Sequence, residues 1–139
     1  MTERKNLADL LTSLHDRYSE LLSLEQEKTE LLVKGDAEGL TPLLNRQQAI
    51  LLECHNLETK RQALCSAMGH ETLLELAEHS LQNKLIFMPL YEKLKAVMDQ
   101  LQDVAERNRK LVETRLSTLR HLQEKAGLSG QGHLITTKV

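Results

Sequence analysis

The sequence has few aromatic residues and no long apolar run. Among its 139 residues are two tyrosines, one phenylalanine and no tryptophan. The longest apolar cluster, residues 85–88 (LIFM), is far shorter than the ~20 residues that cross a bilayer, so we predict no insertion into a membrane. No stretch combines the charged start, apolar middle and small-residue end of a signal peptide, which predicts a cytoplasmic protein.

The patterns that usually mark catalytic and metal sites are also missing. The residues three positions before the six histidines include no carboxylate, so the Glu-x-x-His step of helical di-metal sites is absent. The chain has no Cys-x-x-Cys pair and no glycine-rich phosphate loop. Cys54 and Cys65 lie on one helical face, about three turns apart and too far for a disulfide. We therefore predict buried cysteines, no metal or cofactor, and no enzymatic activity.

Charge is unevenly distributed along the chain. Residues 1–103 hold 11 Lys and Arg against 17 Asp and Glu, a net charge of −6, whereas residues 104–139 hold 7 against 3, a net charge of +4. The basic segment could suggest nucleic-acid binding, but Glu106, Glu113 and Glu124 dilute it, and it has no aromatic residues to stack on bases. A solvated helix face is the better interpretation, and no nucleic-acid partner is expected.

Leucine is abundant instead: 30 of the 139 residues. In the first segment apolar residues recur every three or four positions, which predicts an amphipathic helix that ends at Lys34 and Gly35. The next helix begins either at Asp36 or at Thr41 and Pro42, since both offer a cap. The first stripe comprises Leu7, Leu10, Leu11, Leu14, Tyr18, Leu21, Leu24, Leu31 and Leu32.

A second stripe continues to Gly69, so the first two helices are predicted to form an antiparallel hairpin. It comprises Leu40, Leu43, Leu44, Ile50, Leu51, Cys54, Leu57, Leu64, Cys65 and Met68. Residues 72–75 (TLLE) have the capping-box pattern and open a short helix. Residues 83–89 are predicted to break the helix because Pro89 cannot donate a backbone hydrogen bond. The cluster at residues 85–88 should then plug the hairpin, or else form an exposed patch for a partner.

A third long helix follows, of about 35 residues or roughly 50 Å. Its stripe comprises Leu90, Leu94, Val97, Leu101, Val104, Asn108, Leu111, Leu116, Leu119 and Leu122. Asn108 occupies an apolar position in this stripe, where a buried asparagine commonly fixes register or partner choice. Three glycines between residues 127 and 132 predict a flexible tail over residues 127–139. The fold class is therefore all-α: an antiparallel helical hairpin, a short helix and a third long helix in an elongated, coiled-coil-like bundle over residues 1–126.

Four short segments in order resemble the FlgN family of bacterial flagellar export chaperones. They are residues 34–40 (KGDAEGL), 47–52 (QQAILL), 57–61 (LETKR) and 106–112 (ERNRKLV), and the similarity covers residues 4 to about 125. The resemblance implies a cytosolic helical chaperone domain, without an ATPase of its own. It would hold the hook–filament junction proteins, FlgK and FlgL, before secretion through the flagellar type III apparatus.

In that family the C-terminal region contacts the cargo, which corresponds here to residues 104–139. Members often carry a tyrosine soon after the last helix that is linked to docking on the export gate, but residues 122–139 contain no aromatic residue. Docking of this chain on the gate through such a residue is therefore in question.

The third helix has more apolar length than a hairpin groove needs to cover, especially beyond Val112, and this surplus predicts the client site. The predicted client-binding residues are Val104, Asn108, Leu111, Val112, Leu116, Leu119 and Leu122. A self-associating structural coiled coil without a client would show the same leucines, but would form a stable oligomer without a free groove. A helical metalloenzyme is the other alternative, and metal analysis would reveal it.

Overall fold

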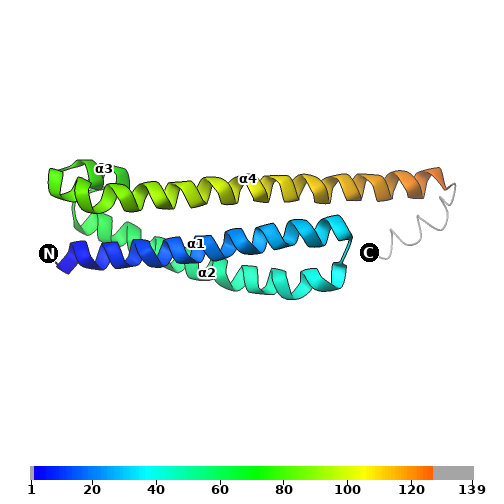
Figure 1. Ribbon diagram of the computed structural model, residues 1–139, viewed down its shortest axis with the longest axis horizontal. Helices are drawn as coiled ribbons and strands as arrows, with labels where there is room; N and C mark the ends of the chain where they lie inside the picture. Colours follow the sequence, from blue (N-terminus) through cyan, green and yellow to red (C-terminus); the bar gives the residue numbers. More distant parts are fainter. Residues whose placement is uncertain (1, 127–139) are drawn as a thin grey trace.

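A computed structural model describes residues 2–126, and their regular structure is entirely helical. The elements are α1 (Thr2–Lys34), α2 (Ala37–Ala67), α3 (Leu73–Glu78) and α4 (Leu81–Lys125). Three long helices lie side by side, and α3 lies at the end where the chain passes from α2 to α4 (Figure 1). The predicted all-α class is confirmed. The tail predicted for residues 127–139 lies outside the described residues.

The helix ends follow local chemistry. Both α1 and α2 end at a glycine with positive φ, Gly35 at +74° and Gly69 at +87°. In each case the amide after the glycine donates to the carbonyl five residues earlier: Asp36 to Leu31 at 3.0 Å and His70 to Cys65 at 2.9 Å. These are Schellman motifs, which satisfy carbonyls that a helix end leaves unpaired.

The helix starts are capped by side chains. Of the two starts considered for α2, the structure has Asp36, whose carboxylate accepts a hydrogen bond from the Gly39 amide at 2.9 Å. Pro42 therefore lies inside α2. Thr72 caps the predicted short helix by accepting from the Glu75 amide at 3.1 Å, which confirms the capping prediction.

The predicted break over residues 83–89 is wrong. Ser80 caps α4 by accepting from the Asn83 amide at 3.1 Å, and the helix continues through Pro89. Proline leaves the carbonyl four residues earlier, that of Leu85, without its helical partner. Leu85 lies on the outer face, 71% exposed, where water reaches that carbonyl. Helix α4 is consequently 45 residues long, about 68 Å, instead of the predicted 35 residues.

The apolar cluster at residues 85–88 packs as part of this helix. Phe87 is fully buried against Leu7, Leu11 and Leu14, with Ile86 and Met88 partly buried beside it. The prediction that this cluster packs on the hairpin is therefore confirmed, but its form was not predicted: because the segment is helical, Leu85 points outward. Cys65 and three residues of α3, Leu73, Leu76 and Ala77, join the same core cluster.

Helix α1 is the central element of the body. It packs along both α2 and α4, whereas no comparable packing joins α2 to α4. Helices α1 and α4 run parallel, as hydrogen bonds with one sequence offset show. Arg4 Nε donates to Asn83 Oδ1 at 2.9 Å and Thr29 Oγ1 donates to Asn108 Oδ1 at 2.5 Å, both 79 residues apart.

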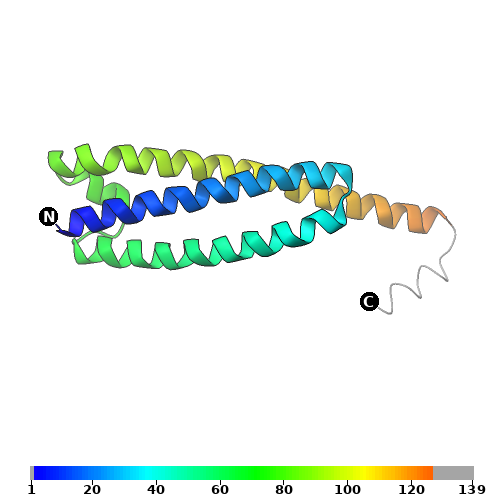
Figure 2. The same ribbon diagram turned by 60° about the horizontal axis from the view of Figure 1, so that its bottom comes forward.

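Helices α1 and α2 form the predicted antiparallel hairpin (Figure 2), and α1 is the helix that packs against both of the others. The polar contacts between them show the antiparallel direction, because a later residue of α1 pairs with an earlier residue of α2. Tyr18 Oη donates to Glu58 at 3.0 Å, and Arg46 Nη2 donates to Glu20 at 2.7 Å. The hairpin and the parallel α4 together form an open array of three helices.

Candidate functional site

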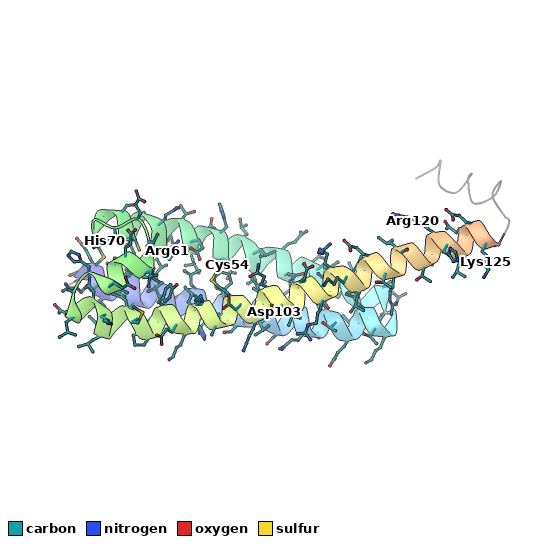
Figure 3. The ribbon with its side chains drawn as sticks, turned by 90° about the horizontal axis from the view of Figure 1, so that it is seen from above. Cys54, Arg61, His70, Asp103, Arg120 and Lys125 are labelled. Carbon is teal, nitrogen blue, oxygen red and sulfur yellow. The ribbon has the colours of Figure 1, made fainter. Side chains whose placement is uncertain are left out.

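Helix α4 is longer than the body that supports it. It is joined to the α1–α2 turn by Arg115, whose Nη2 donates to the Val33 carbonyl at 2.7 Å. Residues 116–125, which we call the overhang, project past this turn (Figure 1), and Figure 3 shows Arg120 and Lys125 on the projecting end. Every residue of the overhang is exposed.

Three leucines form an uncovered stripe on the overhang. Leu116, Leu119 and Leu122 are 47%, 57% and 56% exposed, and their spacing of three residues places them on neighbouring parts of one helix face. Val112, 38% exposed, precedes them on the body, and Leu111 is half-buried. An apolar stripe on a helix with no supporting neighbour is the kind of surface that covers another helix.

The other two residues predicted to bind the client lie inside the body. Val104 is buried, and Asn108 is only 1% exposed. The Asn108 side-chain amide donates to the Glu25 carbonyl oxygen at 2.8 Å and to Glu25 Oε1 at 3.0 Å, and its Oδ1 accepts from Thr29. In this structure Asn108 therefore contacts the protein's own α1.

The hydrogen bonds of Asn108 belong to a buried polar network that joins all three long helices. Glu25 on α1 is only 3% exposed. Its carboxylate accepts from Asn108 of α4 and from Gln47 Nε2 of α2, and it lies 3.5 Å from Lys28 Nζ. Because such a network is satisfied in one alignment only, it specifies register among helices that apolar residues alone would leave free to slide.

Sequence reasoning identified Asn108 but missed its partner. Glu25 follows Leu21 by four residues and precedes Leu32 by seven, so it falls within the apolar stripe of α1. This position in the stripe could have identified Glu25 from the sequence as a buried polar residue. The choice of Asn108's partner, in contrast, depends on which α1 residue lies beside it, and this follows only from the packed arrangement.

A groove runs between α2 and α4, with α1 beneath it. It holds two cavities, of about 770 Å³ and 580 Å³, and Ala105 of α4 lines both. Leu44 and Leu51 of α2, predicted to lie on the stripe of the hairpin, are instead 40% and 50% exposed and line the groove. Figure 3 shows α2 and α4 on either side of α1 in the region of Cys54 and Arg61.

Polar groups at one end of the groove pair with each other. Glu58 accepts hydrogen bonds from Tyr18 Oη at 3.0 Å and from Arg61 Nε at 2.6 Å. Burial, with the negative charge of Glu58 next to it, raises the pKa of the Tyr18 hydroxyl, which keeps its proton. Tyr18, Glu58 and Arg61 therefore line this end of the groove with polar groups that are satisfied within the chain.

Both cysteines are buried, as predicted. Burial raises the pKa of the Cys54 thiol to about 11, with further contributions from Glu53 and Glu58. Burial also raises the pKa of Cys65, against the opposing effect of Arg61. Both thiols are thus protonated at neutral pH, and a protonated thiol is a poor nucleophile.

Two further properties of residues 2–126 bear on function. No group of three or more His, Cys, Asp and Glu side chains in this range is arranged to hold a metal ion. None of the four described helices has a window apolar enough to span a bilayer.

Within residues 2–126 the chain thus has a three-helix body with an exposed apolar stripe and an apolar groove, surfaces of the kind that other helices cover. Its family is also shown: the sequence model described as FlgN protein matches residues 1–126. The chain belongs to the FlgN family, and this membership supports a role as a flagellar export chaperone. No curated protein and no solved structure matches the chain.

Proposed function

We propose that this chain is a cytoplasmic chaperone that binds the hook–filament junction proteins, FlgK and FlgL, before their secretion through the flagellar type III apparatus. The overhang carries this proposal. It presents Leu116, Leu119 and Leu122 on a helix that the rest of the described chain leaves uncovered. The proposal assigns the chain no catalytic step and no cofactor.

The physical logic is that of a helix-binding surface. Proteins that polymerise through coiled-coil-like ends expose apolar helix faces before assembly. An amphipathic helix covers such faces through anchors at three- and four-residue spacing. Leucine-rich and methionine-rich surfaces also adapt to more than one partner, as binding of two clients would require. The positive charge of residues 104–139 would attract acidic client ends.

Within the predicted site the residues would have two different roles. Leu111, Val112, Leu116, Leu119 and Leu122 are at least partly accessible and would contact the client. Val104 and Asn108 are buried and would act indirectly, by holding α4 in the alignment from which the overhang projects. Replacement of Asn108 should therefore lower the stability of the folded protein directly and the affinity for the client only indirectly.

The test replaces Leu116 and Leu119 together with alanine. Because both are exposed, we expect binding to the terminal helical segments of FlgK and FlgL to weaken by roughly 2–4 kcal/mol, with almost no change in melting temperature. Calorimetric titration and a melting curve measure the two effects. The matched control replaces Leu81 and Leu85, exposed leucines near the other end of α4, and should change neither.

Two results would contradict the proposal. If the Leu116 and Leu119 variant unfolds early but binds normally once folded, these leucines stabilise the body and the client site lies elsewhere. If the protein forms a stable oligomer in sedimentation equilibrium and binds neither client, the exposed stripe serves self-association instead. The second result would favour a structural coiled-coil protein.

A further inference from the structure

The α2–α4 groove is long enough to hold a fourth helix. It follows α4 from Tyr91 to Val112, a span of 21 residues or about 32 Å. Helix α1 forms its floor, and α2 and α4 form its walls without packing extensively on each other. Three helices in this arrangement form a four-helix bundle from which one helix is missing.

The residues along the groove recur every seven positions. On α4 they are Tyr91, Met98, Ala105 and Val112, and the series continues to Leu119 on the overhang; on α2 they are Leu44, Leu51 and Glu58. This series differs from the core stripe of α4: Met98 and Ala105 each follow a buried residue, Val97 and Val104, by one position. A seven-residue repeat is the spacing at which helices pack alongside one another in coiled coils.

Charge argues against the α4 helix of a second copy of this chain as the occupant. Two α4 helices paired around Val112 would bring together their C-terminal segments, each with a net charge of +4 over residues 104–139. Like charges side by side oppose such pairing. The occupant is better sought among helices of another protein.

The groove itself indicates which charges that helix should carry. Most charged residues along it pair within the chain, as Arg61 does with Glu58, Lys28 with Glu25 and Arg109 with Glu113. Lys95 and Asp99 also line the groove, one helical turn apart, and neither forms an ion pair with another described residue. A partner helix with an acidic residue beside Lys95 and a basic residue beside Asp99 would complement both.

We propose that the α2–α4 groove receives an amphipathic helix of the client as the fourth helix of the bundle. The proposal rests on the chaperone function proposed above and extends the client site from the overhang onto the body. The client helix carries an apolar seam of at least three seven-residue repeats, with charges that match Lys95 and Asp99. It runs alongside α4 and continues past Val112 onto the leucines of the overhang.

The first test obstructs the groove at its centre. Ala105→Arg places a long cation where the two cavities meet, on a half-buried position that keeps good helix propensity. The matched control is Ala96→Arg, the same change on an exposed residue of α4 that lines neither cavity. With a peptide of the FlgK terminal helical segment, calorimetry should show at least tenfold weaker binding for Ala105→Arg and unchanged binding for Ala96→Arg.

A second measurement does not depend on whether the Ala105→Arg variant folds normally. Met98→Cys places a thiol in the groove and Ala96→Cys places one outside it, while the native cysteines are buried and protonated. Alkylation of residue 98 should slow at least fivefold when the FlgK peptide is added, and alkylation of residue 96 should stay unchanged.

The outcomes separate the two proposals. If the wild-type protein binds the peptide, but Ala105→Arg binds equally well and residue 98 is not protected, the groove proposal fails and the chaperone proposal stands. If residue 98 is already protected without peptide and sedimentation shows a dimer, a second copy occupies the groove and the inference is overturned. If the wild-type protein binds no client segment, both proposals fail.

Discussion

Asn108 connects α4 to α1 at a position of the α4 stripe that an apolar residue would otherwise occupy. Its amide bonds both the backbone and the carboxylate of Glu25, and Thr29 bonds its oxygen. A buried charged group that loses its partner keeps the penalty of being removed from water. The network therefore stabilises one alignment of the helices and opposes every other.

We predict that Asn108→Ala lowers the free energy of unfolding by about 2–4 kcal/mol, because Glu25 and Thr29 lose a buried partner. Glu25→Ala should lower it by a similar amount, and the double variant by clearly less than the sum, since neither residue then leaves the other unpaired. Urea unfolding of the four proteins measures the coupling. Strict additivity would show that the two residues act independently.

Cys54 gives a prediction that depends on pH. Its pKa is raised from 9.0 to about 11, so the folded protein keeps the thiol proton in a range where the unfolded chain releases it. The associated stability is complete below pH 9 and declines as the pH rises to 11. At pH 7, Cys54→Ala should lower the free energy of unfolding by about 1–3 kcal/mol through lost packing.

The difference between wild type and Cys54→Ala should therefore narrow from pH 7 to pH 10.5, which urea unfolding at both pH values measures. A gap that stays constant would mean that the thiol titrates alike in both states. Replacement of Cys54 and Cys65 together should leave client binding intact, because both side chains are buried away from the overhang.

At the scale of the elements, two glycines in the same backbone conformation allow a matched comparison. Gly35 and Gly69 both have positive φ, but a Cβ atom at Gly35 would lie 3.1 Å from Arg115 Nη1, whereas one at Gly69 would meet nothing within 4 Å. Gly69→Ala should cost about 1–2 kcal/mol through the left-handed conformation alone. Gly35→Ala should cost somewhat more, because the Arg115 guanidinium, which donates to the Val33 carbonyl, would have to shift away from the new methyl group.

The comparison is made by thermal or urea unfolding of the two variants, with Arg115→Ala alongside. In the Arg115→Ala background the extra cost of Gly35→Ala should disappear. If it persists there, the guanidinium is not its source, and the local environment of the α1–α2 turn must differ in another way.

Most element boundaries could be predicted because their signals are local. Gly35 and the capping box at residues 72–75 act through their own backbone neighbours. Pro89 could not be interpreted this way, since its effect depends on whether the carbonyl it leaves unpaired faces water. The exposed Leu44 and Leu51 share helical spacing with the core residues of α2. That they line a groove depends on how α2 and α4 are placed on α1, which the sequence does not show.

At the scale of the whole molecule, the three parallel or antiparallel helices and the overhang predict an elongated particle. A compact domain of 139 residues would have a radius of gyration near 14 Å. A rod as long as α4, about 68 Å, has one of roughly 20 Å. Small-angle scattering of the monomer should give a value near the larger figure. A value near 14 Å would contradict the extended α4.

The overhang also differs from the body in what keeps it helical. An isolated helix of about ten residues is marginal in water, because its first turn is unfavourable to nucleate. Helix α4 enters the overhang from the body with that turn already formed, so each further residue needs only the favourable propagation step. Arg115 thus marks a boundary between a segment ordered by tertiary packing and one ordered by propagation, whose fraying end closes again within nanoseconds per residue. A helix that binds there would order the overhang progressively outward from Arg115.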